Sequence, residues 1–250
     1  MRSANPVLNE RTFARAQSAP VLHTPTAAPP ATMTIEGTVY KSAFLLLLVV
    51  GAATVSWRMA DQGVLLLPGV GVAFFLLLGL AIATAFRPQW AIVTGPLYAL
   101  ASGVLLGAIS ALYHQAYEGI VSQAVVATFG TAAGMLLAYT SGAIRATPRF
   151  RRVVVAATLG IVLLYVVSIA MRWFGLAVPL LHDSGPLGIG VSVFIVIVAA
   201  LNLVLDFDLI ERGARSGADK RMEWFGAFAL IVTLVWLYLE ILRLLGKARR

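Results

Sequence analysis

Residues 224–245 read WFGAFALIVTLVWLYLEILRLL, an apolar run interrupted by one acid, Glu240, and one base, Arg243. A run of this length crosses a hydrocarbon core of about 30 Å as an α-helix, in which every backbone polar group is satisfied internally. Six comparable runs precede it, at residues 40–57, 64–86, 91–113, 119–139, 153–174 and 187–208. The sequence therefore predicts an all-α, polytopic membrane protein built as a bundle of seven transmembrane helices.

The composition agrees with this fold class. Of the 250 residues, 60% are hydrophobic and 12% charged, whereas soluble domains are about half apolar and about a quarter charged. This excludes soluble enzymes, coiled coils and secreted disulfide scaffolds, and the absence of cysteine excludes thiolate metal sites and cysteine nucleophiles. We assign the net charge of +8 to basic loops beside an anionic lipid leaflet, and expect no nucleic-acid partner.

The chain divides into three parts. Residues 1–36 contain five prolines and no apolar periodicity, so we expect a disordered cytoplasmic tail. Residues 37–246 form the transmembrane domain, and residues 247–250 a basic C-terminal end. The side that carries the N-terminus holds 13 of the 19 Lys and Arg residues, so the positive-inside rule places the N-terminus in the cytoplasm. Because the basic C-terminal end would then lie outside, a re-entrant last segment with six true spans is the alternative, although its length favours spanning.

Ionisable side chains inside spans are costly and mark functional sites. The candidates are Asp206, Asp208 and Glu240. Glu240 either pairs with Arg243, three residues on, or faces a polar cavity as a titratable group. Asp206 and Asp208 point about 200° apart on a helix, so one faces inward. We take Asp206 as the inward acid, and Asp208 as a solvated helix-end charge paired with Arg212.

An inward Asp206 close to Glu240 would share one proton with it and titrate as a unit. The pair would offer Ca²⁺ two carboxylates, fewer than the 6–8 oxygens of a tight site, so we expect at most weak calcium binding and no other cofactor. In a symmetric hairpin the two acids are level only if the turn centres on residue 223. The expected loop centres near residue 218, a mismatch of about 15 Å in depth, so either the last helix is tilted or starts late, or the acids do not meet.

Small residues at helical spacing predict close helix packing, at Gly103 with Gly107 and at Gly130 with Gly134. Catalysis is not expected. No Lys lies in the middle of the last span for a retinal Schiff base, and no span holds the His residues that a serine or zinc protease requires.

An ordered set of segments resembles the Bax inhibitor-1/YccA family, also called TMBIM. It comprises SGVLLGAIS at 102–110, QAVVATFG at 123–130, LDFDLI at 205–210 and LYLEI at 237–241. The resemblance covers about residues 36 to 245, and the Pro-rich tail with GPLG at 185–188 is similar to an actinobacterial branch. It implies a bacterial inner-membrane protein whose last helix is central.

The resemblance also implies a pH-sensitive calcium leak gated by an acid pair on helices six and seven. Asp206 matches the helix-six acid. Glu240 matches the helix-seven acid, although relatives commonly have Asp there. Arg87 matches a basic residue that latches the helix-six acid closed in some relatives, and is equally well explained as an ordinary positive-inside anchor.

Two other functions are weighed against the leak. Some bacterial relatives restrain a membrane-bound ATP-dependent protease, so the chain is alternatively a non-conducting regulator that presents its tail to such a partner. A proton-coupled transporter of small solutes would need a substrate pocket.

Overall fold

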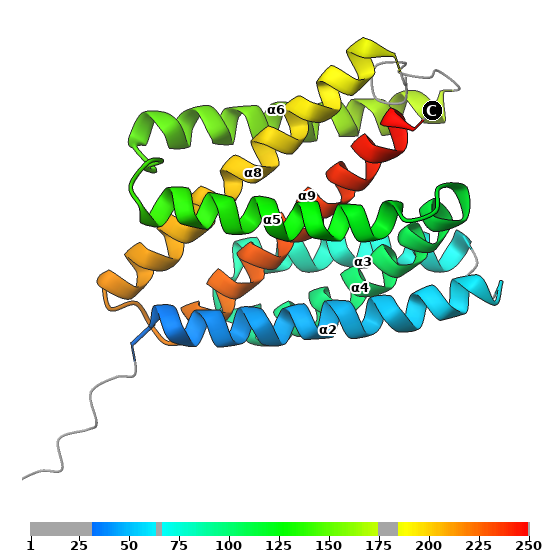
Figure 1. Ribbon diagram of the computed structural model, residues 1–250. Coiled ribbons are helices and arrows are strands. Elements are labelled where there is room, and N and C mark those ends of the chain that lie inside the picture. Colours follow the sequence, from blue (N-terminus) through cyan, green and yellow to red (C-terminus); the bar gives the residue numbers. More distant parts are fainter. Residues whose placement is uncertain (1–31, 64–66, 175–184, 250) are drawn as a thin grey trace, which may run out of the picture. The chain divides into compact units, whose positions relative to one another are not determined.

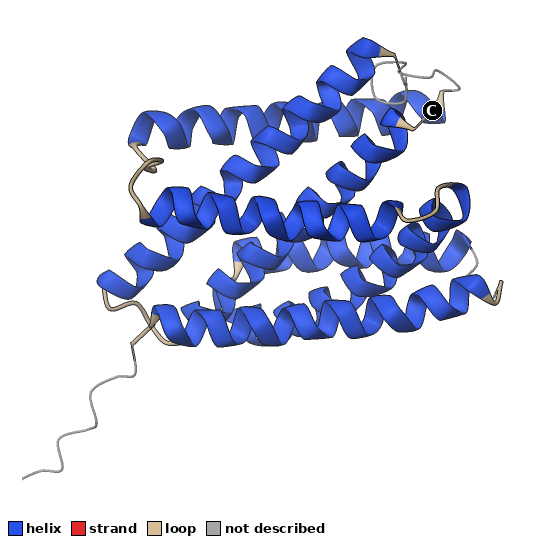
Figure 2. Cartoon of the chain, in the orientation of Figure 1, coloured by secondary structure: helices blue, strands red, loops and turns tan. Residues whose placement is uncertain are grey.

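The computed structural model describes residues 32–63, 67–174 and 185–249. Within these ranges the chain is helical and has no strand (Figure 2). The elements in chain order are α2 (Ile35–Asp61), α3 (Leu67–Phe86), the 3-10 turn η1 (Pro88–Trp90), α4 (Ala91–Ala116), α5 (Ile120–Thr140), α6 (Pro148–Trp173), α8 (Pro186–Arg215) and α9 (Met222–Ala248). The prediction of an all-α polytopic membrane protein is confirmed.

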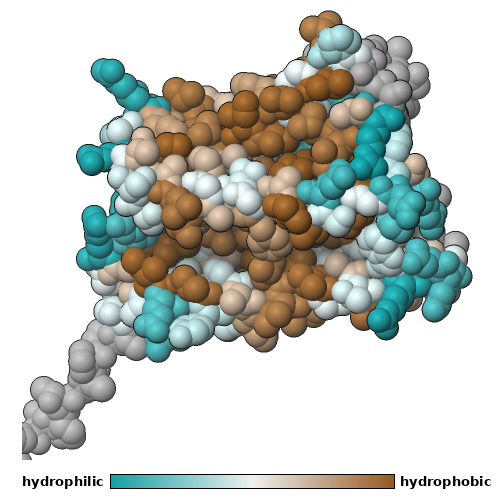
Figure 3. All heavy atoms as spheres, in the orientation of Figure 1, coloured by the Kyte–Doolittle hydropathy of each residue, from teal (hydrophilic) through white to brown (hydrophobic). Residues whose placement is uncertain are grey.

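The helices have the length and surface of membrane spans. Among the described residues, six helices are long and apolar enough to cross a bilayer, and α3 carries a shorter apolar stretch at Gly71–Phe86. One face of the molecule shows an apolar band bounded at both ends by hydrophilic residues (Figure 3). The last helix, α9, continues without a break for 27 residues, or about 40 Å. It is therefore a full-length helix and not the re-entrant segment of the six-span alternative.

α8 extends well beyond its predicted end at residue 208. Its last two turns are polar and are held by ion pairs between residues four apart. Asp208 contacts Arg212 at 2.9 Å, and Glu211 contacts Arg215 at 2.5 Å. Such pairs stabilise the solvent-facing side of a helix, while Ile210 in the same stretch is buried. Gly217, with φ of 65°, then reverses the chain into α9 in a conformation that glycine adopts without strain.

The centre of the bundle is formed by α4 and α9, which are its most buried spans. α9 packs against α2, α4, α5 and α8, and runs beside α8 across the bundle (Figure 1). Its residues Ile231, Leu237 and Leu242 are almost completely buried. The expectation that the last helix is central is thus confirmed.

The two glycine pairs differ in their surroundings. A Cβ atom at Gly103 or Gly107 would collide with backbone oxygens of α2, so the backbones of α2 and α4 lie in direct contact. A Cβ atom at Gly130 or Gly134 would meet nothing within 4 Å. The predicted packing role of Gly130 and Gly134 is therefore wrong, because they lie on an exposed face of α5.

The fold begins before the predicted domain boundary at residue 36. The Met33 amide donates to the Ala218 carbonyl at 2.7 Å, and Thr34 caps α2 by accepting from the Gly37 amide at 3.0 Å. Residues 32–36 are thus attached to the turn between α8 and α9. The predicted disordered tail otherwise lies in residues 1–31, outside the described residues.

Candidate functional site

Asp206 lies on α8 at its interface with α9. Its Oδ2 atom is buried and has no hydrogen-bond partner within the described ranges. Every other buried side-chain oxygen or nitrogen in these ranges has a partner. The Thr233 hydroxyl of α9 contacts the carboxyl group, and also donates to the Ala229 carbonyl at a long 3.2 Å. A buried carboxyl with an unsatisfied oxygen is costly, above all when ionised. It is therefore the prime functional candidate.

The expected pair of Asp206 and Glu240 is not formed. On α9, Asp206 faces Thr233, which precedes Glu240 by seven residues, or about 10 Å along the helix axis. No hydrogen bond joins the two acids, and Glu240 has other partners. The turn after α8 sets this register. Because the turn centres before residue 223, the residue level with Asp206 comes earlier in α9 than Glu240, as the symmetric hairpin predicts.

Glu240 is only 2% exposed and is fully satisfied by donors. The Tyr165 hydroxyl of α6 donates to its Oε1 at 2.6 Å, and the Trp236 ring nitrogen does so at 3.3 Å. Arg243 forms an ion pair with its Oε2 at 3.1 Å. The Arg243 guanidinium also donates to the Tyr165 hydroxyl and lies 5.2 Å from the centre of that ring. Glu240 and Arg243 therefore form the intrahelical pair, and Tyr165 joins it to α6.

Asp208 and Arg87 both lie away from the buried Asp206. Asp208 binds Arg212, as predicted, and also binds Arg151 of α6 at 2.7 Å. The predicted solvated helix-end position is wrong, because the Asp208 side chain is only 15% exposed and α8 continues to Arg215. Arg87 is exposed in the turn after α3, with its guanidinium 5.9 Å from the Trp90 ring centre. In the described part of the chain it makes no ion pair, so the expected latch between Arg87 and Asp206 is not formed.

Two buried charges escaped the sequence reasoning. Glu223, 1% exposed, accepts hydrogen bonds from the Thr34 amide and hydroxyl at 3.0 Å each, and forms an ion pair with Lys41. Lys247, which the sequence assigned to a basic end, is 7% exposed and donates to the Gly188 carbonyl at 3.0 Å and the Ser192 hydroxyl at 2.8 Å. Their partners lie tens of residues or more away, so spacing along one helix gives no signal of either contact.

A hollow of about 800 Å³ opens where α2 begins and α8 ends. It is lined by Phe207, the neighbour of Asp206, and by the polar residues Asp208, Glu211 and Tyr139. The described residues contain no cluster of three or more His, Asp or Glu side chains able to hold a metal ion. Asp206 does not line the hollow, whose wall also holds Arg145 and Arg215, and side chains in this part of the chain do not form a tight calcium cage.

Comparison with protein families gives one assignment. The sequence model of a family described as "Bax inhibitor 1 like" matches residues 5–250, almost the whole chain. Among curated proteins, none matches the sequence.

Proposed function

The chain belongs to the Bax inhibitor-1-like family, and on this premise we propose that it mediates a passive, pH-dependent leak of cations, with Ca²⁺ as the principal ion. The observation that carries the proposal is the buried Oδ2 atom of Asp206, which lacks a hydrogen-bond partner in the described structure. Ionisable groups inside transmembrane bundles mark ion pathways and proton relays. Asp206 is buried and has an oxygen free to accept a hydrogen bond or contact a cation, as such a role requires.

Weak binding suits a leak. Conduction requires an ion to be attracted into the protein and also to be released. One carboxylate, Asp206, with the neutral hydroxyl of Thr233 beside it attracts a cation without holding it in a full coordination shell. In this proposal a cation enters the nearby hollow, whose wall holds Asp208 and Glu211, and passes Phe207 to reach Asp206.

Protonation of Asp206 supplies the pH sensitivity. The ionised carboxylate can only accept, so the Thr233 hydroxyl donates to it. The protonated carboxyl becomes a donor, and Thr233 then directs its hydrogen to the Ala229 carbonyl at 3.2 Å. Proton uptake thus removes the negative charge and reverses the hydrogen bond between α8 and α9. Cation flux falls as the pH decreases through this titration.

In this proposal Glu240 is a structural anchor and not the second acid of a gate. Its charge is compensated by Arg243 at 3.1 Å, and its oxygens are occupied by Tyr165 and Trp236. The gating group is therefore Asp206 with Thr233.

The proposed location is the bacterial inner membrane, with the N-terminus in the cytoplasm. The end of the bundle near the hollow carries Arg145, Arg151, Arg212 and Arg215. Cytoplasmic loops are rich in such residues, so the hollow opens to the cytoplasm.

The test is Ca²⁺ flux into liposomes that contain the purified full-length chain, measured from mildly acidic to mildly alkaline pH. We expect wild-type flux to rise with pH, Asp206→Asn to give low flux without pH dependence, and Asp208→Asn to behave as wild type. If Asp206→Asn retains the wild-type pH profile, Asp206 is not the sensor. If no variant conducts above empty liposomes, the leak is refuted and the protease-regulator function becomes the alternative, which deletion of residues 1–31 would test.

A further inference from the structure

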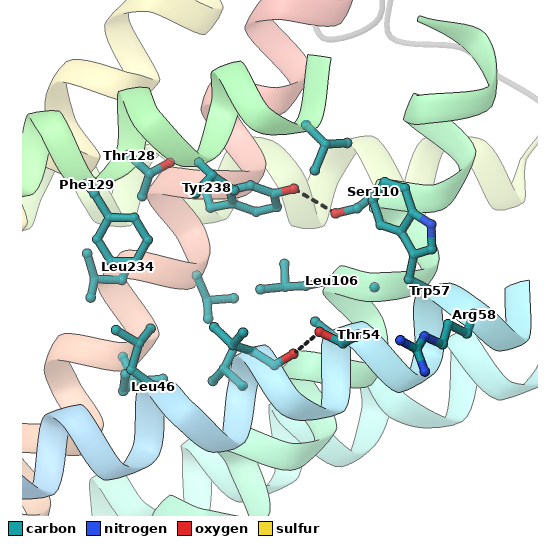
Figure 4. A pocket seen from close by; sticks show the side chains of 18 of the residues that line it. Leu46, Thr54, Trp57, Arg58, Leu106, Ser110, Thr128, Phe129, Leu234 and Tyr238 are labelled. Carbon is teal, nitrogen blue, oxygen red and sulfur yellow. Dashed lines mark hydrogen bonds between the residues drawn. The ribbon is translucent and has the colours of Figure 1, made fainter. Parts of the chain in front are cut away.

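A second cavity lies away from Asp206, between α2 and α5. This α2–α5 groove has a volume of about 530 Å³ and is lined by residues of α2, α4, α5 and α9 (Figure 4). Its walls are α2 and α5, where Val50 is 52% and Val125 39% exposed, so the groove is open along the lipid-facing surface. Leu106 of α4 and Tyr238 of α9, both less than 10% exposed, form its floor. Its size falls within the range of about 300–1,000 Å³ of small-molecule sites.

The polar groups in the α2–α5 groove are already satisfied. The hydroxyls of Ser110 and Tyr238 bond to each other at 2.6 Å. Those of Thr54 and Thr128 donate to carbonyls of their own helices, at 2.8 and 2.7 Å. The rest of the lining below the mouth is apolar. A cavity of this kind offers water or an ion no partner, and an open groove in the hydrocarbon core is filled by a hydrocarbon chain.

Charges occur at one end of the groove. Arg58 and Asp61 lie in the last turn of α2 and line the mouth, next to Trp57. Both are exposed, and in the described part of the chain neither forms an ion pair. Trp57 packs against His114 with ring centres 5.2 Å apart. A tryptophan at a span end marks the level of the lipid headgroups.

We infer that the α2–α5 groove binds an acyl chain of a zwitterionic, amine-bearing phospholipid such as phosphatidylethanolamine. The acyl chain lies on Leu106 and Tyr238. The phosphate lies at Arg58, whose guanidinium matches phosphate oxygens in a bidentate fashion. The ammonium group lies at Asp61. An anionic headgroup without an amine satisfies Arg58 but is repelled by Asp61. The quaternary ammonium of phosphatidylcholine has no N–H to donate to Asp61, so the site selects a zwitterion with a primary amine.

The acyl-chain position can be tested by photolabelling. The full-length chain is placed in phosphatidylcholine nanodiscs with phosphatidylethanolamine that carries a diazirine in its acyl chain, and the labelled peptides are mapped. We expect labels on the floor residues Leu106 and Tyr238, which an acyl chain reaches only by entering the groove. Val125→Trp fills the groove and should lower floor labelling about tenfold, whereas Val126→Trp, at a neighbouring position that is 73% exposed outside the groove, should leave it unchanged.

The headgroup assignment is tested by competition. Unlabelled phosphatidylethanolamine should displace the probe, and phosphatidylglycerol should compete about tenfold less well, because Asp61 repels it. Asp61→Asn should abolish this preference, and Arg58→Gln should weaken both lipids. Both are exposed positions, so the test stands even if Val125→Trp fails to fold. Three results would overturn the inference. Floor labelling could be absent in wild type, it could be equal in Val125→Trp and wild type, or both lipids could displace the probe equally.

Discussion

The contact between α2 and α4 predicts opposite effects for two glycine-to-alanine substitutions. At Gly107 the new Cβ would lie 2.8 Å from the Ser56 Cβ and would collide with the Ala53 carbonyl oxygen. Backbone cannot move aside as a flexible side chain can, so the two helices must separate. At Gly134 the new Cβ meets nothing within 4 Å.

The two substitutions should change the free energy of unfolding in opposite directions. Overpacking costs about 1–3 kcal/mol. Separation of α2 from α4 also lengthens the bond from the Ser56 hydroxyl to the Val104 carbonyl, now 2.7 Å, at a further cost of about 0.5–1.5 kcal/mol. Gly134→Ala instead gains up to about 1 kcal/mol from helix propensity. At about 2–4 °C per kcal/mol for a chain of this size, Gly107→Ala should lower Tm by roughly 3–18 °C.

The assay is thermal unfolding of each purified variant in the same detergent, monitored by tryptophan fluorescence. Gly103→Ala should behave as Gly107→Ala does, because its Cβ would meet the Val49 carbonyl oxygen. A Gly107→Ala variant as stable as wild type would refute the direct contact of the α2 and α4 backbones. Equal losses for Gly107→Ala and Gly134→Ala would refute the exposed position of Gly134.

Three further predictions concern the buried charges. Glu240→Gln should lower stability by about 1–3 kcal/mol by leaving Arg243 uncompensated, yet retain the pH dependence of cation flux; a flattened flux profile would return Glu240 to the gate. Tyr165→Phe should cost about 0.5–1.5 kcal/mol, and a double-mutant cycle of unfolding free energies with Glu240→Gln should give a non-zero coupling energy. Lys41→Met should destabilise the chain by about 1–3 kcal/mol, because Glu223 keeps its charge without an ion-pair partner, and Lys41→Met with Glu223→Gln should recover part of this loss in chemical unfolding.

The spans follow from the sequence because length and hydrophobicity are properties of each segment alone. The predicted runs match the described helices closely, apart from ends such as that of α8, where ion pairs continue the helix beyond the apolar run. The inward orientation of Asp206 relative to Asp208 was also accessible, since the geometry of one helix puts them on opposite sides.

Contacts between helices are harder to predict from the sequence. The spacing of Gly130 and Gly134 is that of a packing motif, but spacing does not say whether a neighbour covers that face. The position of Glu240 inside a span made it the expected partner of Asp206, although the turn length between α8 and α9 puts Thr233 opposite Asp206. The contact of Lys41 with Glu223 joins residues 182 positions apart, and no local pattern reveals it.

Glu223 and Lys247 have a consequence for biogenesis, since they join the two ends of α9 to α2 and α8, which are both synthesised before it. The start of α9 is tied to α2 through Lys41, and its end to α8 through Gly188 and Ser192. The ribosome completes α9 after both helices have been synthesised. A nascent chain arrested before α9 therefore holds Lys41 and the start of α8 without their native contacts. The completion of α9 is the step that converts inserted helices into a finished bundle.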